Sequence, residues 1–91
     1  MKGLNKAAVE TLFRQEAVLM GSEDRVPLHR AEALFGRDAT KHGERLNASS
    51  TGRYLNGYGV GDYTMLALTY RGFQAAASFY NVQLMRREEE Q

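Results

Sequence analysis

The stretch LHRAEALFGRDATKHGERL, residues 28–46, holds the pattern that decides the fold. Apolar side chains recur at helical spacing through Leu28–Phe35, which predicts a short amphipathic helix. Gly36 ends this helix, and Asp38 is a suitable N-cap for a second one that runs to Leu46. Two short helices joined by a tight turn are therefore expected here.

The second of these helices has a less regular pattern than the first. Ala39, either His42 or Gly43, and Leu46 are expected to face inward. Gly43 costs such a helix about 1 kcal/mol relative to alanine. Residues 47–52, NASSTG, are rich in small polar side chains and predict a loop.

An amphipathic helix is predicted on the N-terminal side, from Leu4 to Met20, with a cap at or near Asn5 and an end at Gly21-Ser22. Glu16 falls in the middle of its apolar arc. Either the apolar face of the helix has already turned away from the core at Glu16, or the Glu16 carboxylate is buried and needs a hydrogen-bond or ion-pair partner. The next helix is expected to begin at Pro27, because proline suits a first helical turn.

On the C-terminal side, three glycines alternate in GYGVG, residues 57–61. They are expected to form the tip of a β-hairpin, with either Gly61-Asp62 or Gly57-Tyr58 at the turn positions, since glycine supplies the backbone conformations that tight turns need. Thr64, Leu66 and Leu68 fall on one face of the strand that follows. Thr69 is then expected to cap a last helix.

The last helix, from about Tyr70, carries two apolar stripes. One consists of Phe73, Ala76, Ala77, Tyr80 and Leu84, and the other of Ala75, Phe79 and Val82. The second stripe packs either on a partner chain or between the first helix and the sheet of the same chain. The first of these alternatives predicts a homodimer.

Length and composition limit the classes of protein to which this chain can belong. The 91 residues suffice for one domain, expected over residues 1–87, followed by an acidic tail at 88–91. The sequence has no cysteine, which favours an intracellular, cytoplasmic protein without disulfides. No segment approaches the roughly 20 apolar residues of a membrane span, and the formal net charge is +1.

No sequence motif indicates an enzyme, a cofactor or a metal site. In GYGVG the third glycine comes one position too early for a dinucleotide fingerprint, and a strand follows where a helix should begin. His29 and His42 are the only histidines, and two isolated histidines are a poor metal set. No serine lies in a G-x-S-x-G motif.

The order of predicted elements resembles a winged helix-turn-helix domain. LHRAEALFGRDATKHGERL looks like the helix-turn-helix, and YLNGYGVGDYTMLALTYRGFQAA, residues 54–76, looks like the wing and the exit into the last helix. The resemblance covers roughly residues 4–80. It implies a small α+β domain with three N-terminal helices, a β-hairpin wing and a C-terminal helix, acting as a DNA-binding transcriptional regulator.

The resemblance also implies which residues meet double-stranded DNA. Thr40, Lys41, Glu44 and Arg45 would lie on the outer face of the second helix of the pair. Arg45 would reach a guanine edge, and Lys41, Ser49 and Arg53 would meet phosphates.

A protein-binding module, such as a phage- or plasmid-encoded inhibitor of a host protein, is the alternative. The wing tip, Tyr58 to Asp62, contains no lysine or arginine. Tyrosine is enriched at protein interfaces. The partner-binding residues on this hypothesis are Tyr58, Tyr63, Phe79 and Val82.

Overall fold

Four helices and a three-stranded antiparallel sheet make up the fold in the computed structural model, which describes residues 3–51, 56–60 and 63–90. In chain order the elements are α1 (Lys6–Leu19), β1 (Val26–Pro27), α2 (Leu28–Phe35), α3 (Arg37–Thr51), β2 (Asn56–Val60), β3 (Tyr63–Leu68) and α4 (Tyr70–Glu90). The expected α+β class, with three helices, a hairpin and a last helix, is confirmed at this level. The chain is mostly helical.

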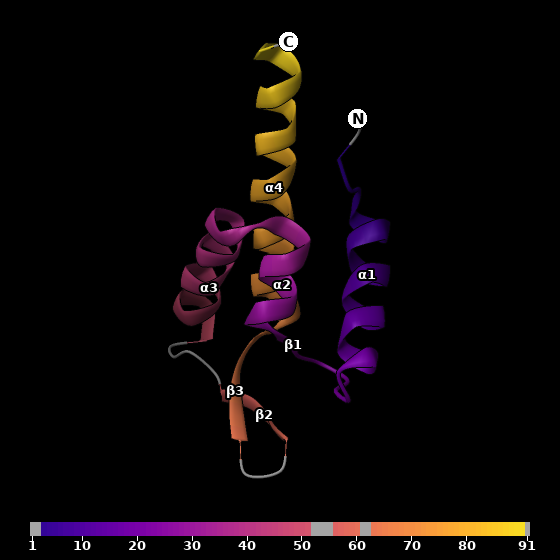
Figure 1. The fold of residues 1–91 in the computed structure, drawn as a ribbon, viewed down its shortest axis with the longest axis vertical. Helices are drawn as coiled ribbons and strands as arrows, with labels where there is room; N and C mark the ends of the chain where they lie inside the picture. Colours follow the sequence, from indigo (N-terminus) through magenta and orange to yellow (C-terminus); the bar gives the residue numbers. More distant parts are fainter. Residues whose placement is uncertain (1–2, 52–55, 61–62, 91) are drawn as a thin grey trace.

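Helix α4 forms the long axis of the molecule, whose extents are 47 × 25 × 18 Å (Figure 1). Helices α1 and α3 lie on either side of it, and the β2–β3 hairpin lies at the end opposite the C-terminus. The C-terminal turns of α4 extend past the other helices, and α4 continues through the acidic residues that were predicted as a tail. None of the described helices is long and apolar enough to cross a bilayer.

Helix α1 has the boundaries that its sequence predicts. The Asn5 Oδ1 accepts a hydrogen bond of 2.8 Å from the Ala8 amide, which satisfies one free N–H of the first turn. At the other end Gly21 adopts a φ of 79°, and the Ser22 amide donates to the Ala17 carbonyl at 2.8 Å. This is a Schellman ending, and the positive φ explains the glycine.

Glu16 is buried and paired. Only 8% of its surface is exposed, and its Oε1 accepts from the Nε and Nη2 of Arg30 at 2.8 and 2.7 Å. Because Arg30 belongs to α2, the pair joins the first two helices. The apolar arc of α1 therefore faces the core at Glu16, and the carboxylate has the partner that burial requires.

The sheet contains a strand that the sequence pattern did not reveal. Val26 pairs with Leu68 and Pro27 with Ala67, so β1 is an edge strand beside β3, and the strand order is β1-β3-β2. The prediction that Pro27 begins α2 is wrong, because helical structure starts at Leu28. A two-residue strand gives no alternation to detect, and an edge strand tolerates a proline.

The glycines of the hairpin lie within a strand. Tyr58 pairs with Met65 and Gly59 with Thr64, and a register shift follows Asn56. The prediction that residues 57–61 form the hairpin tip is therefore wrong for Gly57 and Gly59, which belong to β2. The tip residues Gly61 and Asp62 lie outside the described residues.

Helix α3 is longer than predicted and presents different residues to the core. It runs through Thr51, so the predicted loop at 47–52 is wrong for residues 47–51. Asn47 is fully buried, whereas Leu46 is 40% exposed, so the inward position belongs to the asparagine. Asp38 lies in the first turn of the helix, not at its N-cap.

The core is aromatic at its centre. Phe73 of α4 meets Phe13 of α1 and Phe35 of α2 edge to face, with ring centroids 5.2 and 5.1 Å apart. The first apolar stripe of α4 therefore faces the core, as expected. In the second stripe Phe79 is half-buried within the chain and Val82 is 47% exposed.

The segment before α1 is fixed to α4 by a side-chain amide. Asn81 accepts a hydrogen bond from the Leu4 amide through Oδ1 and donates one to the Leu4 carbonyl through Nδ2, both at 2.8 Å. These two bonds mimic one rung of a β-ladder. They hold residues 77 positions apart in the sequence.

Candidate functional site

Helix α3 has one buried face and one exposed face. Ala39, Thr40, Gly43 and Asn47 are buried against the rest of the domain. On the opposite side Lys41 and Arg45 are exposed, one helical turn apart. The exposed face is the candidate functional site.

The structure separates the residues predicted to meet DNA into three groups. Lys41 and Arg45 lie on the exposed face, with Glu44 half-buried beside them. Thr40 is only 4% exposed and donates its hydroxyl to the Gly36 carbonyl at 2.8 Å, so its predicted outer position is wrong. The third group lies outside the described part of the chain. It consists of the side chain of Ser49 and the whole of Arg53.

Arg45 is oriented by a neighbour on the same helix. Its Nη2 lies 3.1 Å from the Nδ1 of His42, which accepts the hydrogen bond when its proton is on Nε2. The His42 ring in turn packs on Phe79 of α4, with ring centroids 5.0 Å apart and planes at 38°. Phe79, predicted as a partner-binding residue, therefore also supports the exposed face of α3.

Two glycines set the distance between α3 and α4. A Cβ at Gly43 would come within 2.9 Å of the Ala76 Cβ and would also collide with the Gly72 carbonyl oxygen. A Cβ at Gly72 would lie 2.7 Å from the Asn47 Cβ and 3.0 Å from the Gly43 carbonyl oxygen. The backbones touch at this crossing, which explains a glycine in the middle of α3.

A polar link lies one turn further along the same crossing. The Asn47 Oδ1 accepts from the amide and the hydroxyl of Thr69, at 3.0 and 2.6 Å. Thr69 connects β3 to α4, so this single oxygen ties α3 to the point where the last helix begins.

The charge of the exposed face is modest. In the part of α3 whose side chains are described, Arg37, Lys41 and Arg45 oppose Asp38 and Glu44. Arg37 lies 4.0 Å from Glu32 of α2, and both side chains are largely exposed. Lys41 and Arg45 make no ion pair with a described residue, which leaves both cations available to an anionic partner.

The residues predicted to bind a partner protein are also described only in part. Val82 and Met85 are exposed on the outer turns of α4, whereas the side chains of Tyr58 and Tyr63 lie outside the described residues. Across the described residues, no cluster of three or more His, Cys, Asp or Glu side chains is arranged to hold a metal ion.

No protein-family model matches this chain, and comparisons with curated proteins and with solved structures find no significant similarity.

Proposed function

We propose that the chain is a DNA-binding regulator of the winged-helix type, in which α3 enters the major groove of double-stranded DNA. The single observation that carries the proposal is the exposed face of α3, where Lys41 and Arg45 project one turn apart without ion-pair partners among the described residues. The element order, the short turn at Gly36 and the hairpin beyond α3 support it.

The surroundings of α3 suit a helix that must keep its position on DNA. The crossing at Gly43 and Gly72 and the link from Asn47 to Thr69 fix its inner face. His42 restrains the Arg45 guanidinium. A restrained arginine loses less conformational entropy when it binds a guanine edge, where it makes two hydrogen bonds.

The test is a fluorescence titration of the protein against duplex DNA at about 50 and about 200 mM salt. Arg45→Ala is expected to weaken binding about tenfold or more, because a bidentate contact to a base is lost. Lys41→Ala is expected to reduce the salt slope by about one unit, because one phosphate contact is lost.

The control is Arg86→Ala, which removes an exposed cation from the outer part of α4. It is expected to leave the affinity unchanged. No binding by the wild-type protein at about 50 mM salt, or equal losses in all three variants, would refute the proposal.

A second candidate function is a protein-binding module, and the exposed apolar side chains of α4 favour it. Val82 is 47% exposed and Met85 is 59% exposed, both on the C-terminal half of α4. This surface suits a second copy of the chain or a host protein.

Sedimentation of the wild-type protein and of Val82→Lys would test this surface. If α4 forms a homodimer, the wild type sediments as a dimer and the variant shifts to the monomer, because a lysine is then buried without a partner. A wild-type monomer that recovers one stoichiometric host protein, and does not bind DNA, would instead support the inhibitor. A wild-type monomer without such a partner would contradict both forms of this candidate.

A further inference from the structure

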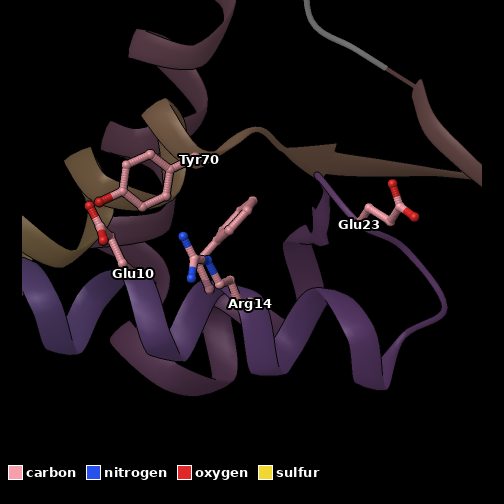
Figure 2. A pocket seen from close by; sticks show the side chains of 5 residues that line it. Glu10, Arg14, Glu23 and Tyr70 are labelled. Carbon is pink, nitrogen blue, oxygen red and sulfur yellow. The ribbon is translucent and has the colours of Figure 1, made fainter.

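A cavity of about 260 Å³ lies on the side of α1 where the chain turns back into the sheet (Figure 2). Its walls come from three segments: α1, the connection between α1 and β1, and the first residue of α4. The lining residues are Glu10, Phe13, Arg14, Glu23 and Tyr70.

The charged residues of this cavity are not paired with one another. Glu10 and Arg14 lie one turn apart on α1, where an ion pair would be common, and Glu23 comes from the following loop. None of the three makes an ion pair or a hydrogen bond with another described residue. Glu10 and Arg14 therefore place one carboxylate and one guanidinium next to Tyr70, each with free hydrogen-bonding capacity, whereas Glu23 lies apart from them at the other end of the cavity (Figure 2).

Tyr70 adds a polar atom that is buried without a partner. Its hydroxyl is inaccessible to solvent and makes no hydrogen bond within the described part of the chain. Burial raises the pKa of this phenol above its usual value, the negative charge of Glu10 raises it further, and Arg14 lowers it. Figure 2 shows the hydroxyl directed toward Glu10.

An unpartnered buried hydroxyl opposes folding, since the group loses its water and gains nothing in exchange. A phenylalanine would fill the same volume without that cost. The Tyr70 ring already packs edge to face on Phe13, with centroids 5.3 Å apart, and this contact does not need the hydroxyl. The hydroxyl is therefore best explained by a ligand that supplies its missing partner.

We propose that this cavity binds a small zwitterion of the amino-acid class, with its ammonium group between the Glu10 carboxylate and the Tyr70 hydroxyl oxygen and its carboxylate on Arg14. The apolar part of the ligand lies along the Phe13 and Tyr70 rings. Glu23 gives the cavity one more negative than positive charge. A plain carboxylate is consequently disfavoured, and an ammonium group is required.

The size and the walls of the cavity allow this mode of binding. A volume of about 260 Å³ accommodates a ligand as large as an aromatic amino acid. The ligand reaches the covered Tyr70 hydroxyl when the side chains of Glu10 and Arg14 rotate away from it and take up the ammonium and carboxylate groups of the ligand. Both rise from the surface of α1, where Glu10 is half-buried and Arg14 is exposed.

The test is a titration of the isotope-labelled protein followed by two-dimensional NMR, with three probes that share one aromatic group. L-phenylalanine carries both charges, phenethylamine carries only the ammonium, and 3-phenylpropionate carries only the carboxylate. Saturable shifts at the amides around Glu10, Glu23 and Tyr70 are expected with phenylalanine, at an affinity about tenfold or more above that of either single-charge probe.

Two variants connect the binding to the proposed contacts. Tyr70→Phe and Arg14→Ala are each expected to weaken phenylalanine binding about tenfold, whereas Arg86→Ala, distant on α4, is expected to leave it unchanged. Thermal unfolding provides a second measurement: Tyr70→Phe should be at least as stable as the wild type. A loss of binding in that variant therefore does not reflect misfolding.

The proposal is overturned if phenylalanine gives no saturable shifts up to about 10 mM. It is also overturned if phenethylamine binds as tightly as phenylalanine, or if binding persists unchanged in Tyr70→Phe and Arg14→Ala. None of these measurements involves DNA, so the outcome is independent of the function proposed for α3.

Discussion

Replacing Gly43 with alanine is expected to destabilise the protein by about 2 kcal/mol, although alanine is the better helix former. A Cβ at this position collides with the Gly72 carbonyl oxygen and comes within 2.9 Å of the Ala76 Cβ, so α3 and α4 must move apart. Overpacking of this kind costs up to about 3 kcal/mol, and the helix propensity of alanine recovers about 1 kcal/mol. Urea unfolding of the two proteins measures the difference.

Ser78→Ala is the control for this substitution, because Ser78 is exposed on α4 and its replacement leaves the crossing intact. It is expected to change stability by less than about 0.5 kcal/mol. The double variant Gly43→Ala, Gly72→Ala should cost less than the sum of the single variants, since one displacement of the helices relieves both collisions. Additive costs, or a stabilised Gly43→Ala, would contradict the close approach of the two backbones.

Asn47→Ala is expected to cost about 2–3 kcal/mol. The substitution removes one oxygen and thereby leaves two donors of Thr69, the amide and the hydroxyl, without their acceptor. Asn47 is fully buried, so its truncation also leaves a cavity beside Gly72. Loss of this amount is a large share of the 5–15 kcal/mol typical of a small domain.

Thr69→Val separates the two donors, because valine has the shape of threonine but lacks the hydroxyl. Its cost is expected to be about 1 kcal/mol, since the amide of residue 69 still donates to Asn47. Thermal unfolding of both variants provides the comparison. If Thr69→Val were as costly as Asn47→Ala, the amide hydrogen bond would contribute nothing measurable, and the link between α3 and α4 would depend on the Thr69 hydroxyl alone.

Local signals predict both ends of α1 and the start of α4, but not the end of α4, which continues through the acidic residues to Glu90. Asn5 caps α1 and Gly21 ends it, and both are short-range features visible in the sequence. The apolar stripe of α4 that contains Phe73 faces the core as its spacing predicts. The hairpin was also predicted, although its glycines lie in β2 and not only near the turn.

Features that depend on a distant partner were not predictable in the same way. The sequence alone predicts a loop at Asn47, because its hydrogen-bonding partner Thr69 lies 22 positions away in the chain. Gly43 is a poor helix former by its sequence alone, and only the fold shows that Gly72 packs against it. A local contact explains the difference at Thr40, which was predicted to be exposed: its hydroxyl donates to the carbonyl of Gly36, the residue before α3, and the side chain is buried.

The candidate site was predictable only in part. Lys41 and Arg45 follow from the period of α3 once its inner face is assigned. The cavity beside Tyr70 gave no sequence signal, because its walls come from residue 10, residue 23 and residue 70, which only the tertiary fold brings together.

The hydrogen bonds between Asn81 and Leu4 have a consequence for folding kinetics. They close a loop of 77 residues, so nearly the whole chain must be in place before they form. We expect them to form late during folding and to open early, before the aromatic core separates. In a hydrogen-exchange experiment the Leu4 amide would then exchange through local fraying, at a rate far above that of the amides around Phe73.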